Sequence, residues 1–133
     1  MNESANRLAM LWILTIIGMV LHFNYQVSGI FYGIELLRPG ASGKEPASVF
    51  VIRTLFYHLP MIWVVCILYV RAKWAFIVLF ILSILYSLAH LGHFIGEVSE
   101  SEKNYSQLSL LFVVLFISLL LTIEHYKMIR KAG

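Results

Sequence analysis

The sequence predicts an all-α integral membrane protein, built as an antiparallel bundle of four transmembrane helices. Sixty per cent of its 133 residues are hydrophobic and only 13% are charged, and the mean hydropathy is +0.83. A soluble domain of this length does not need so much apolar surface. The connections are short, so the chain is predicted to form a single domain. Stretches long enough to cross the hydrocarbon core, which takes about 20 residues, cover residues 8–36, 47–70, 74–95 and 108–126.

The first stretch, 8–36, is longer than one span requires, so it is predicted to tilt or to extend beyond the bilayer. It is interpreted as a retained helix, because its apolar region is too long for a signal peptide and lacks a convincing small-residue cleavage site. Three glycines in this stretch permit the close approach of a neighbouring helix. They are Gly18, Gly29 and Gly33.

The second and third stretches, 47–70 and 74–95, are predicted to be antiparallel neighbours, because only a tight connection separates them. Pro46 suits the first turn of the second helix. Pro60 lies inside that helix, where its missing N–H predicts a kink or a free carbonyl near residue 56. Trp74 follows Lys73 at the start of the third stretch, which is typical of an interfacial anchor.

The fourth stretch, 108–126, is mostly an apolar surface for lipid or for packing. Its polar stripe of Ser118, Thr122 and His125 leads toward the inner face. Glu124 and His125 are predicted to serve in ion pairs or at the interface, outside any functional cluster. The single cysteine, Cys66, lies within the second stretch and allows no internal disulfide.

The distribution of charge predicts the orientation in the membrane. The formal net charge is +3 and the pI is near 9.1, yet the basic residues sort by connection, which indicates a membrane protein rather than a partner of nucleic acid. The side richer in Lys and Arg is cytoplasmic, so both termini are predicted to lie on the cytoplasmic side. The membrane is predicted to be a plasma or inner membrane. The inner set is Arg7, Arg71, Lys73, Lys127, Arg130 and Lys131; the outer set is Arg38, Lys44 and Lys103, beside Glu35, Glu45, Glu97, Glu100 and Glu102.

Histidines are the candidate functional residues. His22, His58, His90 and His93 lie on three different apolar stretches. A rise of about 1.5 Å per residue brings all of them into the outer half of the bilayer, within roughly 10 Å of one another in depth. Ionisable side chains inside a span are costly and usually face the interior of the bundle, so they indicate function.

The third stretch carries the clearest pattern. Its polar residues recur at spacings of three and four and therefore share one stripe of a helix: Ser83, Tyr86, His90, His93 and Glu97. Imidazole with carboxylate suits zinc, iron or copper. His90 and His93 are predicted as the core of a metal site, with His22 and His58 as further ligands and Glu97 as a possible carboxylate.

A b-type haem is the alternative cofactor. His90 and His93 are too close on one helix to bind both faces of a haem, so one axial ligand would come from His22 or His58. Arg53 would meet a haem propionate, or else pair with Glu97 or extend to the outer surface. Tyr86 belongs to the same predicted cofactor site.

The predicted function is binding of a transition metal or haem in the outer half of the bundle, for electron transfer, with quinone as a candidate partner, or for redox chemistry. Two alternatives remain open: a non-catalytic small subunit that stabilises a larger membrane complex, and a protomer of a homo-oligomeric transporter. The sequence contains no HExxH motif, no glycine-rich phosphate loop and no activated nucleophile. Whether the protein is an enzyme is left open.

The predicted topology places the first and third connections outside the cell. Reporter fusions or cysteine labels near Ser42 and Ser101 should both be accessible from outside, because the basic residues favour the opposite face. A cytoplasmic result at either position would overturn the orientation and move the histidines to the inner leaflet.

Overall fold

The computed structural model describes residues 3–37, 40–70, 72–101 and 103–131, and every regular element in them is helical. The prediction of an all-α fold is therefore confirmed. Among the described residues, four continuous helical stretches are long and apolar enough to cross a membrane: Glu3–Tyr32, Ala47–Tyr69, Lys73–Ser99 and Tyr105–Arg130. The elements are α1 (Glu3–Ser28), η1 (Gly29–Tyr32), α2 (Ala47–Arg53), η2 (Thr54–His58), α3 (Leu59–Tyr69), α4 (Lys73–Ser99) and α5 (Tyr105–Lys131).

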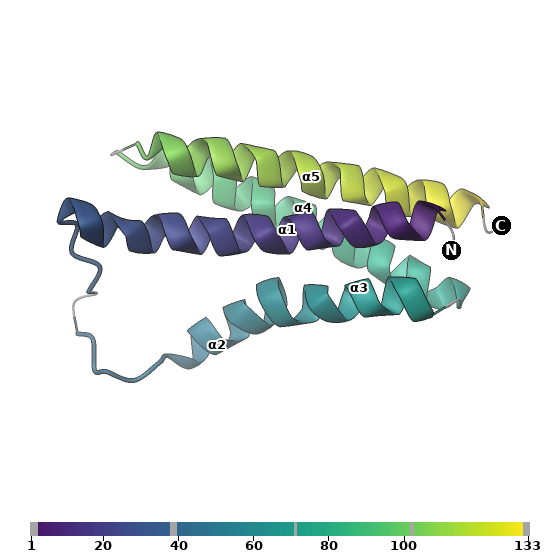
Figure 1. Ribbon diagram of the computed structural model, residues 1–133, viewed down its shortest axis with the longest axis horizontal. Coiled ribbons are helices and arrows are strands. Elements are labelled where there is room, and N and C mark those ends of the chain that lie inside the picture. The colour runs from purple at the N-terminus through teal and green to yellow at the C-terminus, as the bar shows by residue number, and fades with distance from the viewer. Residues whose placement is uncertain (1–2, 38–39, 71, 102, 132–133) are drawn as a thin grey trace.

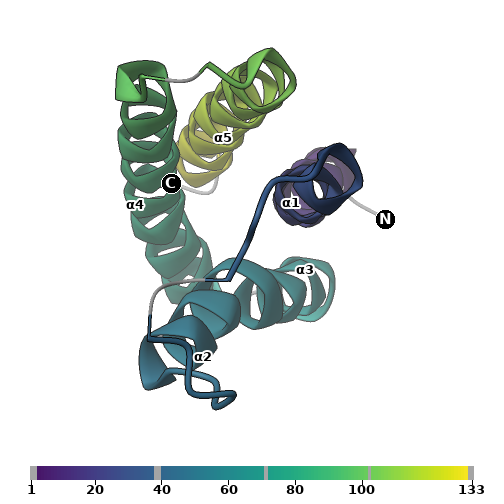
Figure 2. The same cartoon turned by 90° about the vertical axis from the view of Figure 1, so that its left-hand side faces the viewer.

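The helices form a bundle in which α5 packs against both α4 and α1, and α1 also packs against α3. Figure 2 looks along the bundle and shows this order around it, with α1 and α4 diagonally opposite. α1 begins and α5 ends at the same end of the bundle (Figure 1). We call the other end, which carries η1, the distal end.

Buried residues on α1, α4 and α5 recur at alternating spacings of three and four, as in helices that pack side by side with small crossing angles. Each helix thus presents such a stripe to the bundle interior, and much of the remaining surface is exposed and apolar. The stripes are Ala5, Leu8, Trp12, Thr15, Met19 and His22 on α1; Phe76, Leu79, Ser83, Tyr86 and His90 on α4; and Gln107, Leu111, Val114, Ser118, Leu121 and His125 on α5.

The helices differ at their ends from the predicted stretches. α1 and η1 end at Tyr32 instead of residue 36, because Gly33 takes a left-handed conformation with φ of 78°. α5 begins at Tyr105 instead of residue 108, because the Asn104 side chain accepts a hydrogen bond from the Gln107 N–H at 3.1 Å. This is the bond of a helix N-cap, and it adds Gln107 to the helix.

Gly18 is where α1 and α5 approach most tightly among the described glycines. A Cβ atom on this residue would overlap the side chain of Val114. The predicted role of Gly18 in close helix packing is therefore confirmed. Gly33 instead serves at the helix end, through its positive φ.

Pro60 alters the helix as predicted, and the structure identifies the carbonyl it affects. The turn before it, η2, is a π-helix in which the Leu59 N–H bonds to the Thr54 carbonyl. The next donor in that pattern would be Pro60, which has no N–H, so the Leu55 carbonyl lacks a backbone partner. The Tyr86 hydroxyl of α4 donates a hydrogen bond to that carbonyl.

The bond between Tyr86 and the Leu55 carbonyl should therefore depend on Pro60. Tyr86→Phe is expected to destabilise the protein by about 1 kcal/mol, the usual scale of a hydrogen bond in a membrane bundle. In a Pro60→Ala background the restored N–H can serve the carbonyl, so the same substitution should cost much less. Equilibrium unfolding of the four variants in detergent measures this coupling, and additive effects would contradict the assignment.

Candidate functional site

His22 and Gln107 form a two-bond contact between α1 and α5 near the distal end. The His22 Nδ1 lies 2.7 Å from the Gln107 Oε1, and the Gln107 Nε2 donates to the His22 carbonyl at 3.1 Å. Both side chains are buried. Because Gln107 sits in the first turn of α5, the Asn104 cap that begins this helix also positions its side chain.

This contact determines which nitrogen of His22 carries a proton. A carbonyl oxygen can only accept, so the amide nitrogen of Gln107 must face it, and the amide oxygen must face Nδ1. Nδ1 is therefore the protonated nitrogen, and Nε2 keeps a free lone pair. Histidines that bind metals are commonly oriented in this way, by an outer oxygen that accepts from the second ring nitrogen.

Two histidines of α4 complete a cluster with His22. The rings of His22 and His93 meet edge to face, with centroids 4.5 Å apart. His90 lies one turn from His93 on α4, toward the start of that helix. We call His22, His90 and His93 the histidine site.

His90 is the unusual member of the site. Its side chain is only 1% exposed, and neither of its ring nitrogens has a hydrogen-bond partner in the structure. Phe56 and Tyr86 pack around it, with ring centroids 5.8 and 6.3 Å from its own. A polar group buried without a partner costs about 1–3 kcal/mol, so these nitrogens call for a bound water, ion or ligand atom.

The remaining predicted ligands lie elsewhere. His58 is exposed on the surface of the second helix and does not join the histidine site, because the π-turn shifts the register at which its side chain projects. Arg53 is also exposed, as in the predicted alternative in which it extends to the surface, and it pairs with Glu45 rather than with Glu97. Glu97 is only partly buried, two turns from His90 toward the end of α4. Tyr86 is buried beside His90, but its hydroxyl serves the Leu55 carbonyl.

The side chains of the site are not positioned around an ion. Among the described residues, no three His, Cys, Asp or Glu side chains converge as a metal site requires. Because the rings of His22 and His93 are in edge-to-face contact, no haem fits between them. To coordinate an ion, one imidazole would have to rotate so that its lone pair converges with those of the other two histidines. The partly buried His93 is the ring that could rotate most simply.

A second buried histidine forms a hydrogen bond that the sequence did not predict. His125 was predicted at the inner interface, but it is fully buried, and its Nε2 accepts a hydrogen bond from the Trp12 indole at 3.1 Å. Its neighbour Glu124 does form the expected kind of ion pair, with Lys127 at 2.7 Å. The signal in the sequence was the heptad spacing that places His125 on the same stripe as Ser118 and Gln107.

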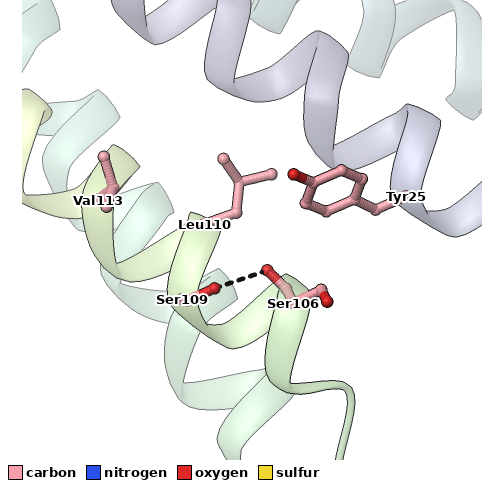
Figure 3. Close-up of a pocket in the computed structure, with 5 residues that line it drawn as sticks. All are labelled: Tyr25, Ser106, Ser109, Leu110 and Val113. Carbon is pink, nitrogen blue, oxygen red and sulfur yellow. Dashed lines mark hydrogen bonds between the residues drawn. The ribbon is translucent and has the colours of Figure 1, made fainter.

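Two surface grooves run between α1 and α5, and neither reaches the histidine site. The distal groove, about 300 Å³, is lined by Tyr25, Ser106, Ser109, Leu110 and Val113. Figure 3 shows Tyr25 of α1 facing Leu110 of α5 across this space, while the Ser109 hydroxyl bonds to the Ser106 carbonyl. The other, about 450 Å³, lies near the chain ends and is lined by Asn6, Arg7, Met10, Leu11, Leu120 and Glu124.

Comparisons of the chain with protein families, with curated proteins and with solved structures gave no match.

Replacing Gln107 should allow His22 to populate both of its neutral tautomers. In the native protein, ¹⁵N NMR of labelled histidine should show His22 protonated at Nδ1, because the Gln107 oxygen accepts there. Gln107→Leu keeps a side chain of similar size but cannot accept, so the spectrum should shift toward a mixture of tautomers. Ser109→Ala, on the exposed face of the same helix, is the matched control. An unchanged His22 signal in the leucine variant would contradict the assignment.

Proposed function

We propose that the protein is an integral membrane protein whose histidine site binds a transition-metal ion in the outer half of the bilayer. The observation that carries this proposal is His90, a fully buried imidazole with two unpartnered nitrogens beside two other histidines. Imidazole is the side chain that zinc, copper and iron share as a ligand.

Two features support insertion with both termini on the cytoplasmic side. The helix starting at Glu3 and the helix ending at Lys131 meet at one end of the bundle (Figure 1), as an even number of spans requires. That end carries Arg7, Lys73, Lys127 and Arg130, in agreement with the preference of basic residues for the cytoplasmic face. Arg38, Arg71 and Glu102, which also entered the charge prediction, lie outside the described residues.

The arrangement of the histidines favours a bare ion over haem. His22 is held by Gln107 with a free Nε2, and His90 is held by tight packing, so two imidazoles are already fixed. A modest rotation of His93 adds a third donor. Haem would instead have to separate His22 from His93 and displace the α1–α5 contact that fixes His22.

The second candidate is a small subunit that packs onto a larger membrane complex. The observation that favours it is α2, in which no residue is buried within the chain. A partner helix would cover its apolar residues, such as Phe50 and Ile52, which are 62% and 52% exposed. In that case the nitrogens of His90 would be satisfied by ordered water, and the histidine site would hold no ion.

Metal content separates the two candidates. Protein purified in mild detergent and loaded with Zn²⁺ or copper should retain about one ion per chain, because a rotation of His93 would let three imidazoles hold it. His90→Ala should abolish retention, and His58→Ala, which alters an exposed histidine, should not. Circular dichroism checks that each variant remains helical.

Equal metal content in the native protein and the His90→Ala variant would rule out the histidine site. Loss of metal on acidification is a further expected result, because protons and the ion compete for the same imidazole lone pairs. Occupancy should fall at mildly acidic pH, before the bundle loses helicity. An ion whose occupancy is flat until the protein unfolds would argue against ligation by histidine.

A further inference from the structure

We propose that the groove near the chain ends, between α1 and α5, binds a phospholipid whose headgroup carries a primary ammonium, such as phosphatidylethanolamine. This part of the molecule is separate from the histidine site, and of the proposed function the inference needs only the insertion of the bundle in a bilayer. The groove has a volume of about 450 Å³, within the range of pockets that bind small molecules. We call it the chain-end groove; its lining is Asn6, Arg7, Met10, Leu11, Leu120 and Glu124.

The lining of the chain-end groove has a charged level and an apolar level. α1 begins and α5 ends at this end of the bundle (Figure 1), so Arg7 near the start of α1 and Glu124 near the end of α5 reach the groove together. Met10 and Leu11 on α1 and Leu120 on α5 lie about one turn further toward the middle of the bundle. The charged level therefore suits a lipid headgroup, and the apolar level suits the acyl chain that continues from it into the hydrocarbon core.

The two charges line the groove from opposite helices, and each is paired on its own helix. Arg7 donates a hydrogen bond to Glu3 on α1, and Lys127 donates one to Glu124 on α5 at 2.7 Å. Among the described residues, no ion pair joins Arg7 to Glu124 across the groove. One bond uses only part of the donors of a guanidinium or the lone pairs of a carboxylate. A cation on one wall and an anion on the other therefore keep capacity for a ligand between them.

The headgroup of phosphatidylethanolamine carries the complementary pair of charges. The guanidinium of Arg7 suits its phosphate, because arginine binds phosphate oxygens in a bidentate manner. The carboxylate of Glu124 suits its primary ammonium, which has three hydrogen-bond donors. Phosphatidylcholine offers the same phosphate, but its trimethylated ammonium has no N–H to donate. Phosphatidylglycerol has no cation for Glu124 and brings a net negative charge beside it, so the groove favours ethanolamine over both.

A buried contact between the same helices fixes the two walls of the groove. Trp12 and His125 follow Leu11 and Glu124 in the sequence, and both are fully buried. The Trp12 indole donates to the His125 Nε2 at 3.1 Å, which joins α1 to α5 at the level of the groove. The charged walls are thus positioned before a lipid binds, and such preorganisation lowers the cost of binding. Among the described residues that line the distal groove, none is charged, so that groove lacks the feature that selects a headgroup.

The test measures lipid binding to the full-length protein in mild detergent by native mass spectrometry. Three lipids with the same acyl chains are compared: phosphatidylethanolamine, phosphatidylcholine and phosphatidylglycerol. Phosphatidylethanolamine should bind about tenfold more tightly than phosphatidylcholine. Tenfold corresponds to about 1.4 kcal/mol, which is the scale of a hydrogen bond to a charged group. Phosphatidylglycerol should also bind more weakly than phosphatidylethanolamine.

Two substitutions separate the roles of the two walls. Glu124→Leu should abolish the preference for ethanolamine over choline, because it removes the acceptor for the ammonium. Arg7→Gln should weaken the binding of all three lipids, because they share the phosphate. The matched controls are Glu97→Leu, a partly buried carboxylate at the distal end, and Arg130→Gln, an exposed base at the same end but outside the lining of the groove. Both controls should bind lipid as the native protein does, and circular dichroism checks that every variant is helical.

Equal affinity of the native protein for phosphatidylethanolamine and phosphatidylcholine overturns the proposal. A preference for ethanolamine that survives Glu124→Leu overturns the role of that carboxylate, and a dimer that carries no lipid assigns the groove to a second copy of the chain instead. Reconstitution into bilayer nanodiscs tests the shared requirement, since a chain that does not insert overturns both the proposed function and this inference. Metal content, measured separately, bears only on the histidine site.

Discussion

The contact between α1 and α5 is the constraint on which the remaining structure depends. At its centre Gly18 lets the two helices approach so closely that any side chain there would overlap Val114. Buried histidine hydrogen bonds lie on either side of this point, His22 with Gln107 toward the distal end and Trp12 with His125 toward the chain ends. Both are short-range interactions, so they require the backbones to be close. Because the interior of the bundle is apolar, each of these polar side chains depends on the other helix for its hydrogen-bond partner.

The same contact gives two histidines opposite chemical characters. Gln107 accepts from Nδ1 of His22 and leaves the lone pair of Nε2 free, whereas Trp12 donates to Nε2 of His125 and occupies its lone pair. An indole N–H can only donate, so His125 is a structural acceptor. His22 instead keeps a free acceptor nitrogen. Two buried histidines on one helix pair therefore differ in which nitrogen is protonated, because their neighbours differ in hydrogen-bonding capacity.

Pro60 shows how a local irregularity in one helix becomes a contact between helices. The missing N–H leaves the Leu55 carbonyl without a backbone donor, and Tyr86 of α4 supplies one. The π-turn also turns Phe56 toward His90 and Tyr57 toward α1. The turn thus encloses one side of the histidine site, while the same change of register leaves His58 on the surface.

By itself, the sequence determined the helical class, the approximate spans and the effect of Pro60, because these follow from hydropathy and from bonds that are local in the chain. It also placed His90 on one stripe with Ser83 and Tyr86, since helical periodicity is local too. Only the tertiary structure decided which helices are neighbours, and so which residues meet. Gln107 and His125 gain their roles from residues more than 60 positions away, and no spacing within one helix encodes the rotation of another about its axis.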